Sequence, residues 1–331
     1  MFQTRPRSAF EATVYIVAAL VGFVAAVPLL GVDNWPLELL VSFRLHLLIG
    51  LVLVALVALL RRHRLIAAAV ALAALINAGD VAATYFESAQ MSADPTAATA
   101  SPGLKLLFAN VLRANGDHGG LLDEIARRDP DVIVLVEVTQ AWDDALAGLA
   151  SAYPYELAQP REHAFGMVLL SRSPLDEAGT EIIMLPRPPE WESDPPVALV
   201  ARIETASGPV TVVGVHPFPP LSGAGYALRN FQLDMMADLV AQQPQPVMAV
   251  GDFNATPWSP ALRRFIKQTG LRGPNIAPTW PALLGPAGLP IDHVLISRDL
   301  RLLSIERGAE IGSDHRPLFA VVTPQGAADT P

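Results

Sequence analysis

The sequence predicts an α/β sandwich domain that follows a group of membrane-spanning helices. Residues 1–86 hold nearly all the long apolar runs of a 331-residue chain whose hydrophobic content is 51%. From residue 104 onward, short apolar runs typical of buried strands alternate with amphipathic helical patterns. Strands and helices mixed in this way are expected to pack as helices on sheets.

Three apolar stretches form the predicted anchor, at about 13–31, 39–60 and 65–86. Each is close to the ~20 residues that a helix needs to cross a bilayer. A cleaved signal peptide fits the first stretch poorly, because two further spans follow it. Arg44 and Asp80 lie near the predicted outer ends of their spans, so we expect their charged groups to reach the lipid headgroups; a proton relay is the alternative.

Basic residues set the expected orientation of this anchor. Arg5 and Arg7 precede the first span and RRHR (61–64) separates the second from the third, whereas the loop between the first two spans has two acids and no base. The positive-inside rule then places the N-terminus in the cytoplasm and everything after residue 86 outside it. We therefore expect a multi-pass protein of a bacterial-type plasma (inner) membrane with an extracytoplasmic domain.

Two further segments and one absent residue type complete the organisation. Residues 87–103 are small, polar and proline-containing, which predicts a linker, and residues 324–331 are expected to be a disordered tail. The chain has no cysteine, so it contains neither disulfides nor thiolate metal ligands. A lack of cysteine fits any compartment and mildly suits an oxidising one.

The strands of the predicted domain are short and almost continuously apolar. Two helical patterns, at 119–130 and 227–243, separate some of them, and both end at or before a proline. Continuous apolar character implies burial of both faces of each strand, with helices outside. The strand-like runs are LKLLFANV, DVIVLVEV, GMVLLS, VALVARIE, VTVVGVH, VMAVGDF, IDHVLIS and PLFAVV.

Polar residues stand at the ends of these runs. In VMAVGDFNATPW (247–258), Asp252 and Asn254 are two positions apart, so an extended chain directs both to one side. A carboxylate beside an amide suits a hard cation or a phosphate oxygen, although an Asx-rich turn gives the same pattern. Glu137 lies in an apolar run, and a buried carboxylate needs a cationic partner. The remaining polar positions are Asn110, His216, Asp292, Asp314 and His315.

These segments resemble the endonuclease/exonuclease/phosphatase (deoxyribonuclease I-like) superfamily. FANV, VLVEV, VGVHP, GDFNATPW, IDHVLIS and SDHRPL occur in the family's order within about 104–322. The resemblance implies a four-layer α/β/β/α sandwich of two mixed sheets over 104–323, with the active site at one rim. Joined to three membrane helices, the chain is similar to the membrane-anchored members associated with glycopeptide-antibiotic resistance, which are thought to act on extracytoplasmic lipid-linked phosphates.

The resemblance also implies metal-dependent hydrolysis of a phosphoester or phosphoanhydride by in-line attack of water. Glu137 is then the principal ligand of Mg²⁺ or Mn²⁺, and Asn110 and Asp314 complete or support that site. The family's other roles extend to a second group of residues, which bind the phosphoryl group or move protons.

Within this second group, His315 is the general base or a phosphate ligand, and Asp292 fixes its tautomer. Asp252 orients or deprotonates the attacking water. Asn254 donates to a phosphate oxygen, and His216 stabilises the pentacovalent state or protonates the leaving group. Arg229 contacts phosphate, or is a solvated helix residue.

Charge and tethering favour a lipid-borne substrate. The net charge is −9, and the only lysines after residue 102 are Lys105 and Lys267, whereas nucleic-acid enzymes rely on basic surface. An anchor in the same bilayer raises the effective concentration of a lipid substrate. An undecaprenyl-type pyrophosphate is the leading expectation and a sphingomyelinase-like phospholipid diester the next.

Two other classes of protein stay open as alternatives: an extracytoplasmic DNA or RNA nuclease, and a binding module with an inactive site. Two Pro-rich loops, HPFPPLSGAGY (216–226) and residues 186–196, are expected to shape the cleft. Their apolar residues Phe218, Leu221 and Trp191 contact lipid or simply pack locally.

Overall fold

The computed structural model describes residues 34–92, 103–188 and 194–325, together with isolated positions between 12 and 22. The chain divides into two compact units, Met1–Phe86 with Trp258–Pro260, and Glu87–Pro257 with Ala261–Pro331. Most of the predicted first span, residues 93–102 of the predicted linker, Trp191 and residues 326–331 lie outside the described residues.

The first unit is built from helices. They are α2 (Trp35–Ser42), α3 (Arg44–Leu60) and α4 (Arg64–Ser92). Within α4, Arg64–Ser88 is long and apolar enough to cross a membrane, with a mean hydropathy of 2.0. The pair α2 and α3 qualifies only if it is counted as one span bent by 73°. The described residues therefore contain one or two candidate spans, which correspond to the predicted spans at 65–86 and 39–60, and the predicted span at 13–31 stays a prediction. Helix α4 also continues six residues into the predicted linker.

Arg44 and Asp80 form an ion pair within this unit. The Nε atom of Arg44 lies 3.2 Å from Asp80 Oδ2, and the Arg44 side chain is 2% exposed. The expectation that both charges reach the headgroups separately is therefore wrong. Because an unpaired charge between apolar helices is costly, each side chain neutralises the other where α3 and α4 pack together.

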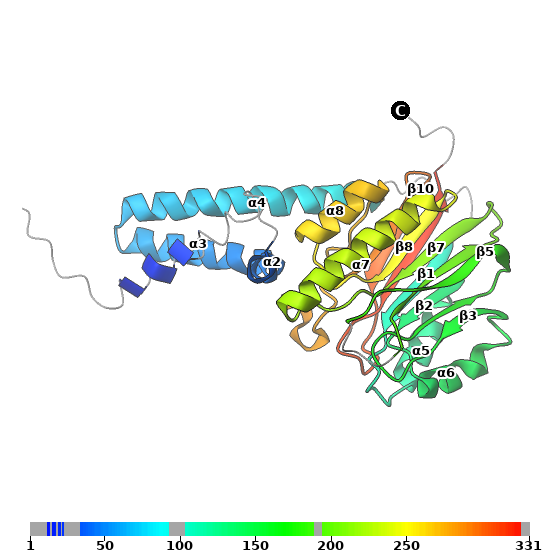
Figure 1. The fold of residues 1–331 in the computed structure, drawn as a ribbon. Helices are drawn as coiled ribbons and strands as arrows, with labels where there is room; N and C mark the ends of the chain where they lie inside the picture. Colours follow the sequence, from blue (N-terminus) through cyan, green and yellow to red (C-terminus); the bar gives the residue numbers. More distant parts are fainter. Residues whose placement is uncertain are drawn as a thin grey trace, which may run out of the picture. The chain divides into compact units, whose positions relative to one another are not determined.

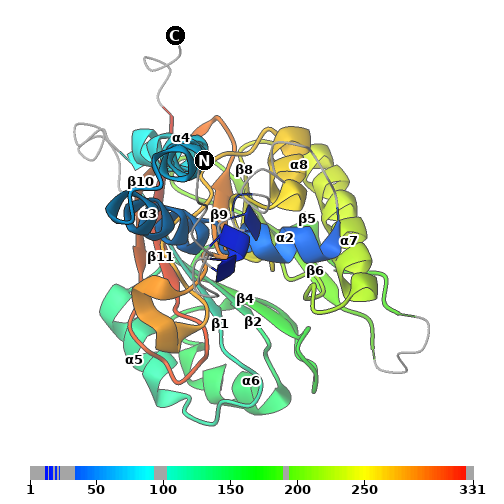
Figure 2. The same cartoon turned by 90° about the vertical axis from the view of Figure 1, so that its left-hand side faces the viewer.

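The second unit contains two mixed sheets. The six-stranded sheet has the order β10-β11-β1-β2-β4-β3 and the five-stranded sheet the order β5-β6-β7-β8-β9 (Figures 1 and 2). Strands β1 and β2 run parallel, as do β7 and β8, and the other pairs are antiparallel. The strands are β1 (Leu104–Asn110), β2 (Val132–Val136), β3 (Tyr155–Gln159), β4 (Met167–Ser171), β5 (Leu175–Met184), β6 (Val197–Ile203), β7 (Val210–Val215), β8 (Val247–Asp252), β9 (Asp292–Ile296), β10 (Leu300–Arg307) and β11 (Leu318–Pro324).

Helices cover the outer face of each sheet. Helices α5 (Gly119–Arg128) and α6 (Gln140–Leu146) pack on the six-stranded sheet, and α7 (Gly223–Gln242) and α8 (Pro260–Thr269) pack on the five-stranded sheet (Figure 2). Two short 3₁₀ helices, η3 (Ala147–Leu149) and η4 (Ala282–Ala287), lie in connections. The predicted α/β/β/α layering is confirmed.

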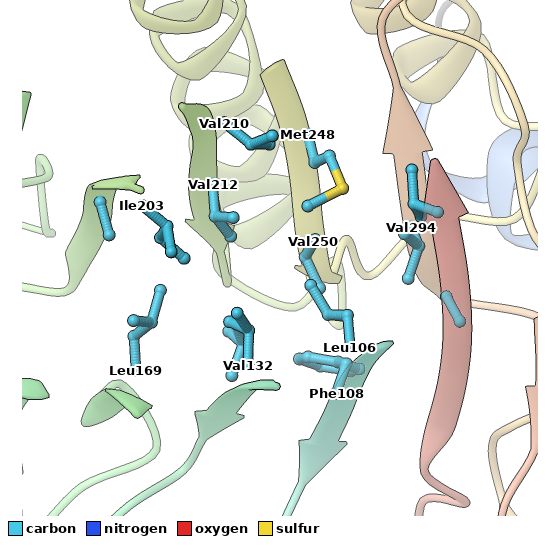
Figure 3. Packing of buried hydrophobic residues seen from close by; sticks show 14 of the residues in the cluster. Leu106, Phe108, Val132, Leu169, Ile203, Val210, Val212, Met248, Val250 and Val294 are labelled. Atoms are coloured by element: carbon cyan, nitrogen blue, oxygen red, sulfur yellow. The ribbon is translucent and has the colours of Figure 1, made fainter. Parts of the chain in front are cut away.

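The core between the sheets follows from the alternation of side chains along each strand. Leu106 and Phe108 on β1 point toward the facing sheet, whose residues Val212 and Val250 belong to the same buried cluster (Figure 3). The intervening Leu107 belongs instead to the cluster under α5 and α6. All five side chains are fully buried. Burial of both strand faces holds the two sheets together, and so fixes their strand ends relative to each other.

Candidate active site

Strand register brings the predicted polar residues to one end of the sandwich. Parallel pairing sets Asn110 beside Val136, the last residue of β2, and antiparallel pairing of β8 with β9 sets Asp252 opposite Asp292. Glu137 and His216 directly follow β2 and β7. Residues far apart in sequence therefore meet where strands end, as the sequence predicted.

Glu137 is held in an uncommon backbone conformation. Its φ is +61°, in the left-handed region that non-glycine residues rarely adopt. Its Oε1 atom accepts a hydrogen bond from Asn110 Nδ2 at 3.0 Å, and its Oε2 atom accepts one from the Arg113 backbone N–H at 3.2 Å. These contacts offset a backbone cost of order 1–3 kcal/mol, and they aim the carboxylate at the strand ends.

Asp252 connects the two sheets at this end. The Asn110 amide also donates to Asp252 Oδ2, at 3.3 Å. The same oxygen lies 3.7 Å from Nε2 of His216 and 3.7 Å from Nε2 of His315. Asp252 is 2% exposed. Glu137 and His315 are thus linked through only two intervening side chains.

His315 is oriented by a buried carboxylate. Its Nδ1 atom lies 2.9 Å from Asp292 Oδ2, so Nε2 faces Asp252. The backbone N–H of His315 donates to Ser313 Oγ, which itself donates to the Asn110 carbonyl at 2.7 Å. The loop before β11 is therefore tied to β1, and the imidazole is fixed between two carboxylates from the other sheet.

Burial and neighbouring charges shift the pKa values of the titratable groups in this cluster in different directions. Burial, together with the charge of Asp292, raises the pKa of Asp252 to about 7. Burial alone would lower the pKa of His315, but the charge and hydrogen bond of Asp292, with Asp252 and Asp314, raise it to about 10. Burial lowers the pKa of His216 to about 4. At neutral pH, His315 is a cation and His216 is neutral.

Asp314 is the predicted metal ligand that lies apart from the others. It is exposed, and its Oδ2 atom accepts a hydrogen bond from Trp280 Nε1 at 2.9 Å. Among the described residues, the acidic and histidine group whose potential ligand atoms lie within 4.8 Å of one another is Asp252, Asp292 and His315. The structure therefore places Asn110 and Glu137 together but directs the Asp314 carboxylate toward an indole.

Arg229 is not a solvated helix residue, which was one of its two sequence interpretations; the phosphate contact stays a prediction. Arg229 is neither at the surface nor in contact with solvent, because its exposure is 0%. Its Nη1 atom donates to the Asn254 carbonyl at 2.8 Å. Asn254 has φ +49°, its backbone N–H donates to Asp252 Oδ1, and its side-chain amide donates to the Pro217 carbonyl at 3.1 Å. Arg229 thus supports the turn that carries Asn254.

Sequence analysis missed a second buried polar residue on α7. Gln232 accepts from the Phe218 backbone N–H at 2.7 Å and donates to the Pro186 carbonyl at 2.6 Å, which anchors both Pro-rich loops. The spacing of Arg229 and Gln232, one helical turn apart, was the available signal. Phe218 stacks on Phe165 at 5.2 Å between ring centroids, which is local packing, whereas Leu221 is 78% exposed.

His293 is another site neighbour that the sequence did not single out. It is fully buried beside Asp292, its Nδ1 atom accepts from the Asn275 N–H at 3.0 Å, and its Nε2 atom lies 2.8 Å from the Ala255 carbonyl. Burial lowers its pKa to about 4. The ring links β9 to the segment that follows β8, and its position within the IDH sequence was the signal.

The donor set of the cluster fits a hard divalent cation. Glu137, Asp252 and Asp292 are carboxylates, Asn110 supplies an amide, and the chain has no soft cysteine ligand. Burial, followed by the nearby charge of Asp292, raises the pKa of Asp252, and a cation bound beside this carboxylate would favour its ionised form.

Comparisons with known proteins agree with this geometry. The model of the Endonuclease/Exonuclease/phosphatase family matches residues 107–315, and the chain belongs to this family of divalent-metal-dependent hydrolases that act on phosphoester bonds. A search of curated proteins found no match.

Solved structures share the fold. The endonuclease/exonuclease/phosphatase from Beutenbergia cavernae is 20% identical, with a TM-score of 0.57, covering 69% of this chain and 73% of its own. Sphingomyelinase C from Streptomyces griseocarneus is 20% identical, with a TM-score of 0.51, covering 67% and 99%. D. rerio TDP2 complexed with a single-strand DNA product is 15% identical, with a TM-score of 0.54, covering 67% and 100%.

Proposed function

We propose that this protein is a metal-dependent phosphoesterase that hydrolyses a lipid-linked or small-molecule phosphoester or pyrophosphate outside the cytoplasm. The observation that carries the proposal is the contact chain from Glu137 through Asn110 and Asp252 to His315. This chain joins oxygen ligands, a buried carboxylate and an imidazolium at one end of the two sheets.

Glu137 and Asn110 are the residues proposed to hold Mg²⁺ or Mn²⁺, with Asp314 as an outer contributor through water. When bound, the cation neutralises charge on the phosphoryl oxygens and on the leaving oxygen. The protein itself must hold the Glu137 carboxylate in a fixed orientation. The two hydrogen bonds from the Asn110 amide and the Arg113 backbone N–H do this.

The other residues are proposed to handle protons and phosphoryl oxygens. A water oxygen forms a bond to phosphorus while the bond from phosphorus to the leaving oxygen breaks, and Asp252 receives the water proton. His315, held as a cation between Asp292 and Asp252, donates from Nε2 to a phosphoryl oxygen. Neutral His216 donates a hydrogen bond to the same group. Asn254 fixes Asp252 through its backbone N–H.

The lipid-linked substrate is supported by the composition of the chain. The span Arg64–Ser88 is long and apolar enough to hold the protein at a bilayer, where tethering concentrates the enzyme near a lipid substrate. The net charge of −9 disfavours a polyanionic nucleic acid. A pyrophosphate-bearing polyprenyl lipid is the first candidate, with a phospholipid diester as the second.

Hydrolysis by the full-length protein in detergent tests the proposal. With Mg²⁺ or Mn²⁺, the protein is offered a polyprenyl diphosphate, sphingomyelin and plasmid DNA. We expect the diphosphate to be cleaved fastest, and Asp292→Asn to abolish turnover while the matched exposed variant Asp299→Asn does not. Fast plasmid nicking with inert lipids would overturn the substrate assignment, and equal activity of Asp292→Asn would overturn the site.

The extracytoplasmic location is testable because the chain has no cysteine. Ser207→Cys places a single thiol in the exposed β6–β7 turn, and Arg61→Cys places one in the turn between α3 and α4. In intact cells, a membrane-impermeant maleimide should label only the first. Labelling of Arg61→Cys alone would show that the topology is the opposite of the one proposed.

A further inference from the structure

A cavity lies in the same unit as the candidate site, and of its lining residues only Asp194 belongs to a segment, 186–196, that the sequence singled out. Its volume is about 430 Å³. It is formed mainly by the connection between β3 and β4, together with the start of α6. The lining residues are Gln140, Pro160, Arg161, Glu162, His163 and Asp194.

This cavity is attached to the backbone segment that carries Glu137. The Arg161 N–H donates to the carbonyl of Val138, the residue after Glu137, at 2.9 Å, and the Val138 N–H donates to the Gly166 carbonyl at 3.1 Å. A Cβ atom at Gly166 would stand 2.0 Å from the Val138 carbonyl oxygen, so only glycine permits this approach. The cavity therefore has a fixed position beside the proposed metal ligand.

Aromatic contacts join the cavity to the other side of the site. The ring of His163 lies 6.0 Å from that of Phe165, and the Phe165 ring lies 5.2 Å from that of His216, between centroids. The cavity and the catalytic cluster are thus separated by one aromatic side chain.

Arginine side chains dominate the charge at this position. Arg161 is 13% exposed, and its buried Nε atom has no hydrogen-bond partner among the residues that the structure describes. Arg113, whose backbone N–H bonds Glu137, is exposed and forms no ion pair within the described part of the chain. Burial, followed by the charges of Arg161 and Arg113, lowers the pKa of His163, which places both cations near this ring.

Two acids also line the cavity, and neither blocks an anion. Glu162 Oε1 accepts a hydrogen bond from the Gln140 backbone N–H at 3.2 Å. Asp194 Oδ2 lies 3.3 Å from Arg161 Nη1, but its side chain is 69% exposed. An ion pair with so exposed a partner is weak, so a phosphate group can displace it.

We propose that Arg161, Arg113 and His163 form an anion subsite that binds a second phosphate of the substrate, next to the phosphoryl group under attack. The inference rests on the proposed phosphoesterase function and narrows its substrate class to diphosphate esters. Arg161 supplies a planar donor array that suits a phosphate oxygen pair, and Asp194 occupies one of its donors in the absence of substrate.

Steady-state kinetics of the full-length protein test the subsite. The substrates are farnesyl diphosphate, which has two phosphates, and bis(p-nitrophenyl) phosphate, which has one. Arg161→Ala is expected to lower the ratio of kcat/KM for the diphosphate to that for the diester at least tenfold, mainly through KM. Asp194→Asn should change the ratio in the opposite direction. The matched control, Arg298→Ala in the exposed β9–β10 turn, should leave it unchanged.

The outcomes separate this inference from the proposed function. Equal losses on both substrates in Arg161→Ala, or hydrolysis of the diester without the diphosphate, would overturn the subsite while the phosphoesterase assignment stands. If neither substrate is cleaved, the proposed function fails, and binding of inorganic pyrophosphate to the metal-stripped protein decides the subsite. Calorimetry should then show affinity weakened at least tenfold by Arg161→Ala; equal affinities would overturn it.

Discussion

The two sheets of the sandwich bring different chemistry to the candidate site. The six-stranded sheet supplies Asn110 and Glu137, which are oxygen ligands suited to a divalent cation. The five-stranded sheet supplies His216, Asp252 and Asp292, whose carboxylates and imidazole suit proton transfer and phosphate binding. The first set is rigid through backbone hydrogen bonds, whereas the second is buried deeply enough to shift pKa values.

Two contacts connect the two sheets at this end. The Asn110 amide donates to Asp252, and His315, from the loop before β11, bonds Asp292 on β9. Neither sheet has a complete site alone. Under the proposed mechanism, the packing between the sheets matters for catalysis, because it sets the distance between the proposed metal ligands and the proposed proton-transfer groups.

Asp252→Asn removes the proposed general base from the five-stranded sheet, and we expect it to have the largest effect on activity. The amide cannot accept the water proton, so kcat should fall by about 10³-fold, within the usual range for a general base. Hydrolysis of the diphosphate measures this, with circular dichroism as the folding check. Asp238→Asn, on the exposed face of α7, is the matched control and should keep full activity. Retained turnover in Asp252→Asn would assign the base to another residue.

Phe108→Ala tests the core that both halves share. Phe108 is fully buried between the sheets, and its truncation should cost about 3–5 kcal/mol of unfolding free energy. Denaturant unfolding in detergent measures the loss. Because the cavity loosens the spacing between sheets, kcat should also fall in the protein that stays folded. Unchanged kcat would show that the sheets hold their alignment without this side chain.

A buried histidine of the five-stranded sheet, His293, should also make the stability of the domain sensitive to acid. His293 has a pKa of about 4 in the folded protein, against about 6.5 when unfolded, so the unfolded chain binds its proton first. Stability is therefore complete above pH ~6.5 and is lost as the pH falls toward 4, by about 3 kcal/mol for this group. Denaturant unfolding at pH 7.5, 6 and 5 measures how steeply the free energy of unfolding falls with pH. His293→Gln should flatten it, and an identical slope would contradict this account.

Arg229→Met should have the smallest of these effects, because it acts through a neighbour. Loss of the bond to the Asn254 carbonyl lets the turn beside Asp252 move, and we expect kcat to fall about tenfold with little change in KM. Arg229→Lys should recover part of the rate. The control is Arg264→Met on α8, which is partly exposed. A change confined to stability would show that Arg229 is structural only.

Much of this arrangement was predictable from local pattern. Near-continuous apolar strands indicated burial on both faces, and the polar residues at their ends, ordered as in the family, identified Asn110, Glu137, Asp252 and His315. The burial of the strands and the meeting of these residues at one end of the sandwich were predictable because alternation and strand pairing are fixed by the backbone. The catalytic and metal-binding roles of these residues stay predictions.

The features that the sequence did not predict depend on distant contacts. Asp314 turns to Trp280, and Arg229 is buried under a turn that lies 25 residues later. Arg44 meets Asp80 across two helices, and Arg161 reaches the Glu137 segment only because Gly166 permits close approach. Each depends on how elements pack, which residue spacing does not encode.

Metal dependence of hydrolysis is the most direct test of a shared site between the two sheets. The full-length protein is stripped with EDTA and titrated with Mg²⁺, with the Glu137→Gln variant alongside. We expect activity to vanish and return with the metal, and the variant to need at least tenfold more Mg²⁺ for half-maximal rate. Undiminished hydrolysis by the stripped protein, or identical titrations for the two proteins, would contradict the account.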